Sequence, residues 1–221
     1  MNAPPLQDVR DRLVLAALPH VPFEGWSRPA LREAARDAGF DPSMVGRAFP
    51  GGPVAAIDHF CGLADRRLAE EAAAQGLEAM RLTDRISWLV RRRLEVWAEH
   101  REAVRRAVTL LALPGNGAVA LRATWRTVDV IWHAAGDRSV DAGYYTKRLT
   151  LSAVYSSTLF CWLEDHSDGF ADSWDFLGRR LADVARLPKM RAKLRHSLEA
   201  LPNPLGMVLK RARSRRHFGV T

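Results

Sequence analysis

Apolar residues recur at helical spacing along most of the chain, and turn residues separate the successive runs. Residues 8–19 carry an apolar residue every three or four positions, which predicts a first helix. Residues 23–26 are expected to form a connector. Ser27, with a proline two residues later, has the pattern of a helix N-cap, so a second helix is expected from there to Gly39. Asp41-Pro42 starts a short third helix by the same rule.

Longer amphipathic runs follow these three helices. We expect one helix over residues 54–75 and a second, continuous helix over residues 83–112, with charged pairs at i,i+4 spacing on its solvent face. Pro114-Gly115-Asn116-Gly117 predicts a turn, and the helix after it is expected to end at Gly136. The shared apolar faces are expected at Ile86, Val90, Leu94, Trp97, Val104 and Val108 in the long helix, and at Leu121, Trp125, Val128 and Trp132 in the next.

No charged residue lies between Arg148 and Glu164, in a chain with 33 Lys and Arg and 25 Asp and Glu. This segment is shorter than the roughly 20 apolar residues that span a bilayer. Its large side chains point in all directions at helical spacing, which predicts a helix covered on every side by other helices, a second subunit or an apolar ligand. Its Ser and Thr hydroxyls are expected to bond carbonyl oxygens one turn back.

No segment of strand period occurs in the sequence, so we predict an all-α fold. After a polar turn over residues 164–169, the next helix has its apolar stripe at Phe170, Trp174, Leu177, Leu181 and Val184. The predicted organisation is a helix-turn-helix-like headpiece over residues 1–53, a helical body over 54–187 and a basic tail over 188–221.

The net charge of +8 is concentrated at the C-terminal end. Residues 186–221 carry ten Lys and Arg against Glu199, whereas residues 1–60 carry six Arg against seven acids. Asn203 and Pro204 can start a tail helix with an apolar strip between basic side chains, which suits the headgroup region of an anionic membrane. A frayed tail or a nucleic-acid contact is the alternative. The predicted membrane-binding residues are Leu205, Val208, Leu209, Lys210, Arg211, Arg213, Arg215 and Arg216.

Motifs of catalysis are missing from the sequence. It contains no Glu-x-x-His of di-iron bundles, no phosphate-binding or dinucleotide-binding glycine loop and no nucleophile elbow. The segment 164–168, which is rich in acids, is expected to supply turn caps rather than metal ligands. Cys61 and Cys161 lie in apolar surroundings and are expected to be reduced thiols. We therefore predict that the protein is not an enzyme and has no catalytic residue, metal or cofactor.

The sequence around the uncharged helix carries a further signature. It comprises Trp132-His133-Ala134-Ala135-Gly136-Asp137-Arg138-Ser139, then Asp141, Tyr145, Thr146, Lys147 and Arg148, then Tyr155-Ser156-Ser157-Thr158, and finally Asp165, Ser167, Phe170, Trp174, Phe176 and Leu177. This block resembles the lipid-binding accessory protein of ubiquinone biosynthesis, the ninth protein of the coenzyme Q series. A weaker resemblance extends over about residues 8–210. It implies a TetR-like, all-helical homodimer that binds an isoprenoid lipid or quinone intermediate and assists the demethoxyubiquinone hydroxylase without catalysing a reaction.

The resemblance also implies the location of the binding surfaces. Residues 54–187 would bind lipid and dimerise, and residues 188–221 would contact the membrane. The predicted lipid-binding residues are Leu110, Leu113, Val128, Ile131, Trp132, Val154, Tyr155 and Thr158, each of which also fits ordinary core packing. The hydroxylase is expected to dock at Asp168, Phe170, Trp174, Phe176 and Leu177, although Trp174 fits core packing equally well.

The N-terminal segment bears on the expected location. Residues 1–18 contain no apolar run of signal-peptide length and carry Asp8 and Asp11, so we expect neither a secretory signal nor a transit peptide. This favours a bacterial protein in the cytoplasm, peripherally associated with the inner membrane. In a eukaryote the corresponding location would be the matrix side of the mitochondrial membrane.

The headpiece pattern also raises the alternative of a TetR-type transcription regulator with a hydrophobic ligand. A DNA-binding headpiece neutralises several phosphates, yet residues 1–60 carry a net negative charge. Gly46 would destabilise a recognition helix by about 1 kcal/mol, and Arg47 is the basic side chain left there to read a base edge. We therefore expect no nucleic-acid partner.

Overall fold

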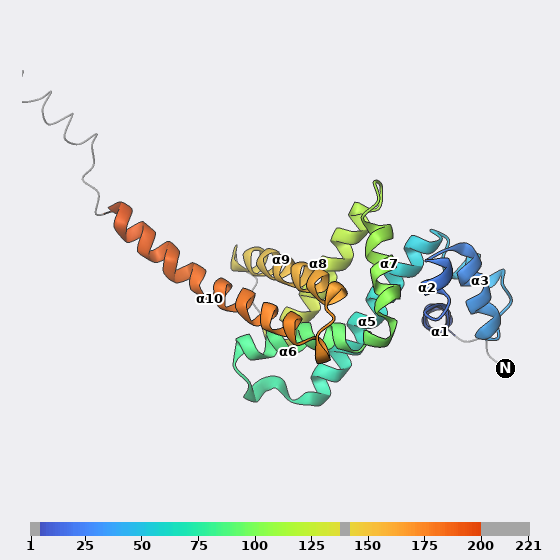
Figure 1. Cartoon of the computed structure of the whole chain (residues 1–221), viewed down its shortest axis with the longest axis horizontal. Helices are drawn as coiled ribbons and strands as arrows, with labels where there is room; N and C mark the ends of the chain where they lie inside the picture. Colours follow the sequence, from blue (N-terminus) through green and yellow to red (C-terminus); the bar gives the residue numbers. More distant parts are fainter. Residues whose placement is uncertain (1–4, 138–141, 200–221) are drawn as a thin grey trace, which may run out of the picture. The chain divides into compact units, whose positions relative to one another are not determined.

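The computed structural model describes residues 5–137 and 142–199, with side chains over 5–137 and 144–186, and every regular element in these ranges is helical (Figure 1). Its contacts divide the chain into one unit over residues 1–181 and a second over 182–221. The α-helices are α1 (Leu6–Ala17), α2 (Val21–Glu24), α3 (Arg28–Asp37), α4 (Met44–Ala48), α5 (Pro53–Gln75), α6 (Leu82–Glu95), α7 (Arg101–Leu111), α8 (Gly117–Ala134), α9 (Ala142–Glu164) and α10 (Ala171–Glu199). The predicted all-α class is confirmed.

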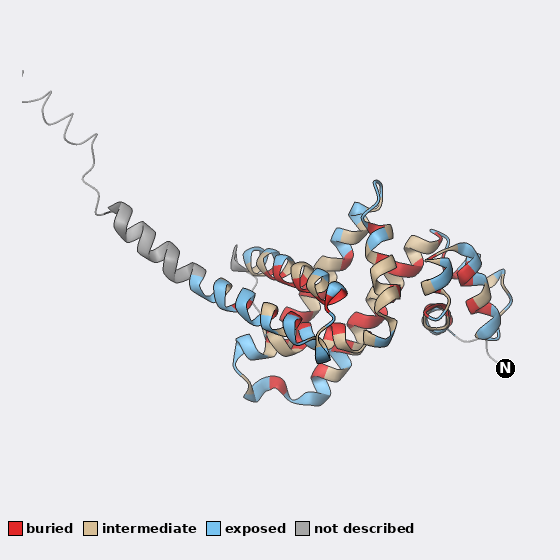
Figure 2. Cartoon of the chain, viewed as in Figure 1, coloured by how far each residue is buried: buried red, intermediate tan, exposed pale blue. Residues whose placement is uncertain are grey.

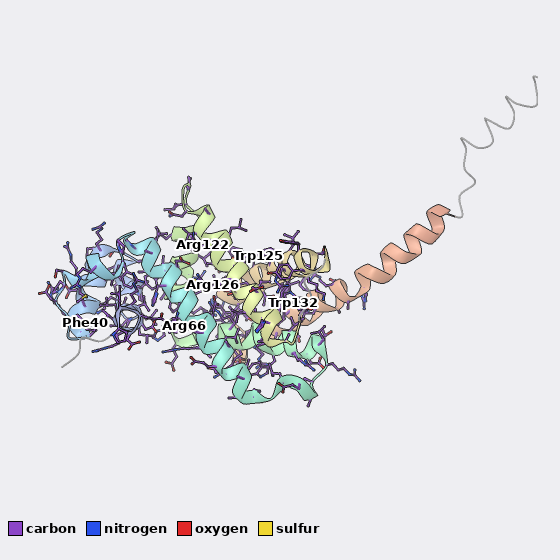
Figure 3. All side chains as sticks on the ribbon, turned by 180° about the vertical axis from the view of Figure 1, so that it is seen from behind. Phe40, Arg66, Arg122, Trp125, Arg126 and Trp132 are labelled. Atoms are coloured by element: carbon purple, nitrogen blue, oxygen red, sulfur yellow. The ribbon has the colours of Figure 1, made fainter. Side chains whose placement is uncertain are left out.

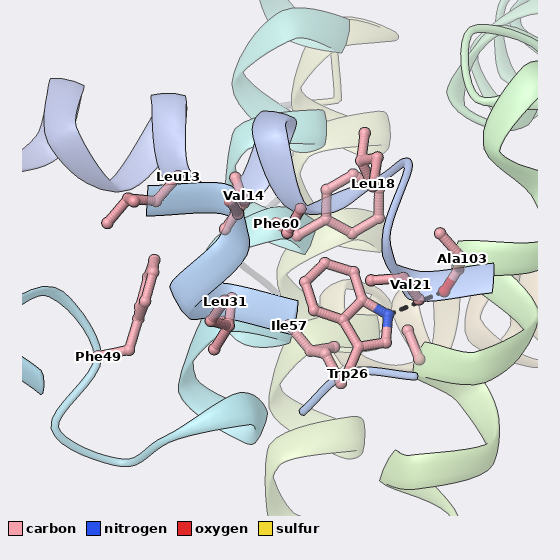
Figure 4. Packing of buried hydrophobic residues seen from close by; sticks show 14 of the residues in the cluster. Leu13, Val14, Leu18, Val21, Trp26, Leu31, Phe49, Ile57, Phe60 and Ala103 are labelled. Carbon is pink, nitrogen blue, oxygen red and sulfur yellow. Dashed lines mark hydrogen bonds between the residues drawn. The ribbon is translucent and has the colours of Figure 1, made fainter. Parts of the chain in front are cut away.

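Helices α1 to α4 lie in the segment predicted as the headpiece, and a tryptophan joins this segment to α5 and α7. The predicted cap is present, because the backbone N–H of Ala30 donates to Ser27 Oγ at 3.2 Å. The Trp26 indole N–H donates to the carbonyl oxygen of Ala103 on α7 at 2.9 Å, and its ring lies 5.7 Å from that of Phe60 on α5 (Figure 4). One apolar cluster therefore includes residues of α1, α3, α5 and α7. The predicted connector 23–26 is wrong in its first half, because Phe23 and Glu24 complete the short helix α2.

The expected continuous helix over residues 83–112 is in fact two helices. Helix α6 ends at Glu95, a 3₁₀ turn follows at Ala98–His100, and α7 begins at Arg101. Trp97 leaves helical geometry at φ −111° and ψ 13°, and its ring packs edge-on against Phe60 at 4.7 Å. No glycine or proline marks this break in the sequence.

The break also changes which positions of the chain are buried. In α6 the predicted face is correct, because its residues Ile86, Val90 and Leu94 are all buried. In α7 the buried positions are Ala103, Ala107 and Leu111, whereas Val104 and Val108 are only half-buried. The predicted ion pairs are present on the solvent side, between Arg91 and Glu95 at 2.6 Å and between Arg106 and Glu102 at 3.0 Å.

Helix α8 packs along α5 and α9, and its ends agree with the sequence pattern. It begins after the predicted turn and ends before Gly136, whose φ of 90° is accessible chiefly to glycine. The predicted apolar face is partly wrong. Val128 and Trp132 are buried, but Leu121 is 69% exposed and Trp125 is half-buried, because the buried face includes Ala123, Thr127 and Ile131 instead.

Helix α9 contains the uncharged segment. Its hydroxyl groups behave as predicted: Thr150, Ser152, Ser157 and Thr158 each donate to the carbonyl oxygen four residues earlier, at 2.7–2.8 Å. The other helices of this chain cover only one side of α9, so cover on every side stays a prediction that requires a second subunit or an apolar ligand. Leu149 is 69% exposed and Phe160 is 56% exposed, while Leu151, Val154 and Trp162 face the core. Figure 2 marks buried and exposed positions on opposite sides of α9.

The polar turn between α9 and α10 is built around one carboxylate. Asp165 accepts hydrogen bonds from the backbone N–H and hydroxyl of Ser167 at 2.8 and 2.6 Å, and from those of Ser173 at 2.9 and 2.5 Å. The prediction that this segment supplies caps is confirmed. Within the described residues, no helix is both long enough and apolar enough to cross a membrane.

Candidate ligand cavity

An apolar cavity of about 280 Å³ lies in the helical body, between α5, α6, α7, α8 and α9. Its walls come from segments that are far apart in the sequence, which the packing of α5 on α8 and of α8 on α9 brings together. Its lining residues are Phe60, Cys61, Arg93, Leu94, Trp97, Val104, Ala107, Val108, Leu111, Ala112, Ala120, Ala123, Thr124, Thr127, Tyr155, Ser156, Leu159, Phe160 and Trp162. The volume is near the lower end of the range for small-molecule sites, roughly 300–1,000 Å³.

A buried ion pair stands at one wall of the cavity. Arg93, which lines the cavity, is 6% exposed, and its Nε donates to Asp65 Oδ1 at 3.0 Å. Asp65 also accepts from Thr127 Oγ1 at 2.8 Å and from Arg126 Nε at 3.1 Å. Both carboxylate oxygens thus have hydrogen-bond partners, as a buried charge requires. Figure 3 shows Arg126 and Arg122 projecting from α8 on the side of α5, and both guanidinium groups pair with Asp58 at 3.1 Å.

Two indole N–H groups at the cavity have no hydrogen-bond partner among the described residues. They belong to Trp97, which is 3% exposed, and to Trp162, which is fully buried. A third lining group, Tyr155, is 6% exposed, and burial raises its pKa to about 12, so its phenol is neutral at physiological pH. The cavity therefore combines mostly apolar walls with a few polar side chains, namely Arg93, Tyr155, Thr124, Thr127 and Ser156. This is the usual composition of a site for an apolar ligand with a polar group.

Of the eight residues predicted from the sequence to bind lipid, one lines the cavity and seven do not. Tyr155 lines the cavity, but the other seven are not among its lining residues. Five of them, Val128, Ile131, Trp132, Val154 and Thr158, are buried, Leu110 is half-buried and Leu113 is 51% exposed beside the α7–α8 turn. The predicted residues thus come from or directly follow α7, α8 and α9, which all contribute to the cavity wall, but all except Tyr155 lie away from it.

The residues predicted to bind a partner are near the start of α10. Asp168 is exposed and Phe176 is half-buried, with the Arg180 guanidinium 5.4 Å from its ring centre. Phe170 is half-buried against Trp162, and the Trp174 indole N–H donates to the carbonyl oxygen of Gly169 at 2.8 Å. Leu177 is 1% exposed and belongs to the core. The predicted membrane-binding residues, Leu205 to Arg216, lie outside the described residues.

Several cavity residues were missed by the sequence prediction. Trp97 was recognised only as a core position, and Arg93, which falls on the apolar face by its spacing from Ile86 and Val90, was not assigned to the cavity. Trp162 is at the end of the uncharged segment, where the sequence predicts burial without indicating what the side chain faces. Arg93 has no acidic residue three or four positions away along the helix and falls among apolar residues. This was the one signal in the sequence for its buried pair with Asp65.

Comparison with known proteins finds a family match for the segment that contains α8 and α9, two of the helices that line this cavity. A sequence model of the COQ9 family matches residues 117–188, which begin with α8, include α9 and end within α10. These residues are similar to the COQ9 family. It is 35% identical over 188 residues to the ubiquinone biosynthesis protein COQ9, mitochondrial, of Drosophila melanogaster, which covers 82% of this chain and 57% of the relative. The human COQ9 protein is 32% identical over 202 residues, covering 88% of this chain and 63% of the relative.

The chain therefore spans between about half and two thirds of the length of these COQ9 relatives. Among solved structures, a TetR transcriptional regulator from Nitrosomonas europaea is similar, with a TM-score of 0.66 and 24% identity over 80% of this chain and 98% of that one. At this identity the likeness shows the fold alone. The predicted TetR-like fold is confirmed.

Proposed function

We propose that this protein is a non-enzymatic accessory protein of ubiquinone biosynthesis, which takes an isoprenoid quinone intermediate from the membrane and presents it to the demethoxyubiquinone hydroxylase. The observation that carries the proposal is the coincidence of the segment similar to the COQ9 family with the cavity. Helices α8 and α9, both within residues 117–188, supply Ala120, Ala123, Tyr155, Leu159 and Trp162 to the apolar lining. The names of the relatives place them in ubiquinone biosynthesis.

The cavity size limits what part of a lipid it holds. A cavity of roughly 150 Å³ takes up benzene in an engineered protein, so about 280 Å³ accommodates one substituted ring or a short stretch of an isoprenoid chain. A long polyprenyl tail would therefore extend beyond it. The side of α9 with exposed Leu149 and Phe160 offers an apolar surface on which such a tail, or a second protomer, would be shielded from water.

A lipid-transfer experiment tests the proposal. Vesicles that contain demethoxyubiquinone are incubated with the purified protein and removed by centrifugation, and the lipid left with the protein is quantified. We expect the protein to retain the prenylated quinone in preference to bulk phospholipid. Ala123→Trp, which fills the cavity from α8, is expected to abolish retention, whereas Ala73→Trp on the exposed side of α5 should not. Equal retention by both variants would contradict the proposal.

We further propose that the tail holds the protein reversibly at an anionic membrane, at the cytoplasmic face in a bacterium or the matrix face in a mitochondrion. The basic side chains of residues 203–221 support this, because each contributes about 1 kcal/mol near an anionic surface. Deletion of residues 203–221 is expected to abolish binding to anionic vesicles while the circular dichroism of the helical body is retained. Unchanged vesicle binding would refute the membrane role of the tail.

Exposed apolar side chains on α8 and α9 also support a homodimer through these two helices. Leu121 and Leu149 are each 69% exposed and Tyr145 is 68% exposed, more than a lone protomer is expected to leave uncovered along one helix pair. Leu149→Asp is expected to convert the protein to monomers in sedimentation-velocity experiments. Leu82→Asp, at a 49% exposed leucine on α6, is the matched control and should leave the dimer intact. Monomeric wild-type protein would contradict the proposal.

The hydroxylase is proposed to dock near the start of α10, at the exposed part of the predicted surface. Phe176 and Asp168 are accessible there, whereas Leu177 supports the helix from the core. Phe176→Ala is expected to weaken binding of purified hydroxylase, measured by biolayer interferometry, without change in thermal stability. Unchanged affinity would place the docking surface elsewhere.

Sequence-specific binding of duplex DNA without lipid retention would instead support the alternative of a transcription regulator.

A further inference from the structure

Helix α3 carries three arginines on one side. Arg28, Arg32 and Arg36 follow one another at i,i+4 spacing, so they lie in a row over about 12 Å of the helix, and all three are exposed. The neighbouring face of the same helix, which includes Leu31 and Ala34, packs in the core (Figure 4). Like charges at i,i+4 spacing destabilise a helix. An anion beside this arginine stripe would offset the repulsion.

The arginine stripe lines a cleft of about 430 Å³ between α3 and α4. The other lining residues, among them Ser43 and Gly52, come from α4 and the turns on either side of it. The guanidinium group of Arg28 lies beside Gly52, where an added Cβ atom would be 3.8 Å from it. The cleft thus gathers three arginine side chains around one concave surface.

The positive charge of the cleft is only partly compensated. In the part of the chain that the structure describes, no carboxylate lines the cleft. Arg36 pairs with Glu33, but the side chains of Arg28 and Arg32 form no hydrogen bond or ion pair with the described residues. Asp41, the next acid along the chain, accepts a backbone N–H of its own turn at 2.8 Å. Two unpaired guanidinium groups therefore stand at one concave surface.

We propose that this cleft binds a phosphate group through Arg28 and Arg32, with Arg36 as a weaker contact. The planar fork of a guanidinium group matches two oxygens of a phosphate. A phosphate monoester carries up to two negative charges at neutral pH, as many as the two unpaired arginines balance, whereas a carboxylate carries one. The group would belong to a phospholipid headgroup or to a soluble phosphate ester. The cleft shares no lining residue with the apolar cavity, so this proposal does not depend on the lipid proposed there.

Duplex DNA fits this part of the chain less well than a single phosphate group. A protein that grips a duplex neutralises several phosphates along it, whereas residues 1–60 carry six Arg against seven acids. Helix α4 has five residues, includes Gly46 and offers Arg47 as its one basic side chain. The unpaired positive charge at the cleft is thus sufficient for one phosphate group but not for a length of duplex.

A titration of the full-length protein with inorganic phosphate tests the proposal. Backbone ¹⁵N–¹H spectra are recorded while phosphate replaces chloride at constant ionic strength, and the signals of Ser43 and Gly52 are expected to shift to saturation. The variant Arg28→Gln/Arg32→Gln should bind phosphate about tenfold more weakly, because it lacks two charged donors. Arg81→Gln is the matched control and should bind phosphate as the wild type does. Arg81 is exposed, has no side-chain hydrogen bond or ion pair within the described ranges, and does not line the cleft.

Vesicle binding then identifies the source of the phosphate group. Both variants keep the basic tail, so a difference between them reports on Arg28 and Arg32. Weaker binding of Arg28→Gln/Arg32→Gln than of Arg81→Gln to phosphatidylcholine vesicles that contain phosphatidic acid would assign the site to a lipid headgroup, and equal binding would assign it to a soluble phosphate ester. Phosphate signals that stay in place, or equal phosphate affinity in the two variants, would overturn the proposal whatever the vesicles show. Duplex DNA binding that requires the two arginines would in that case assign the cleft to nucleic acid.

Discussion

The ion pair between Asp65 and Arg93 gives the most specific prediction for the integrity of the cavity. Asp65→Asn keeps the size of the side chain and one oxygen acceptor but removes the negative charge. Arg93, 6% exposed, would then carry a buried charge whose nearest counter-ion is gone, while Thr127 and Arg126 would each lose a charge-assisted bond. Loss of one partner from a buried pair costs about 3–5 kcal/mol, a large share of the roughly 5–15 kcal/mol that stabilises a domain.

Urea unfolding, followed by circular dichroism at neutral pH, measures this loss. With a denaturant slope of about 2–3 kcal/mol/M, the midpoint of Asp65→Asn should fall by at least about 1 M. The matched control is Glu95→Gln, which breaks the exposed pair with Arg91 and should cost less than about 1 kcal/mol. Adding Arg93→Met to Asp65→Asn should recover part of the loss, because no uncompensated charge then remains. A loss no larger than that of the control would refute the reasoning.

Three further predictions concern groups away from the cavity or on its edge. Burial opposes the ionisation of Asp165, but hydrogen bonds from Ser167 and Ser173 outweigh it and lower its pKa. Its stabilising effect is therefore present above about pH 4 and is lost as the pH falls further. In urea unfolding, Asp165→Asn should make the free energy of unfolding fall less steeply below about pH 4 than it does in the wild type. An unchanged fall would contradict this. Ser27→Ala should lower stability by about 1 kcal/mol through loss of the α3 cap, with Ser43→Ala as a control that has no cap bond. Because burial raises the pKa of Tyr155 to about 12, stability should decline as the pH rises above about 10, and Tyr155→Phe should remove part of that decline.

Local signals in the sequence predict much of the helical framework. The cap at Ser27, the turn at residues 114–117 and the end of α8 before Gly136 depend on the preferences of single residues, which act over one helical turn. The hydroxyl bonds within α9 are equally local, since each joins residues four positions apart.

The break at Trp97 is different in origin. No local residue requires it, and the ring contact between Trp97 and Phe60 joins α5 to a position 37 residues later. A helix pattern read alone therefore continues through this point, since the amphipathic period and the charged pairs persist on both sides. Tertiary packing overrides the local preference, and it also rotates the buried face of α7 from Val104 to Ala103.

The cavity could not be predicted from composition, because a hollow core and a filled core use the same residues. Val128 and Ile131 fit an apolar tunnel as well as Tyr155 does, yet they are fully buried and do not line the cavity. The face of α8 or α9 that lines the cavity is decided by the packing of five helices, α5 to α9. The one-sided exposure of Leu149 and Phe160 likewise requires the positions of the neighbouring helices.

The central claim, that this protein binds a prenylated quinone intermediate, is tested most directly by extraction of the purified full-length protein with organic solvent and mass spectrometry of the extract. The account predicts a ubiquinone intermediate with a methoxylated or hydroxylated ring, recovered in near-stoichiometric amount from the wild type and depleted in Ala123→Trp. Recovery of phospholipid alone, or of no lipid, would contradict it.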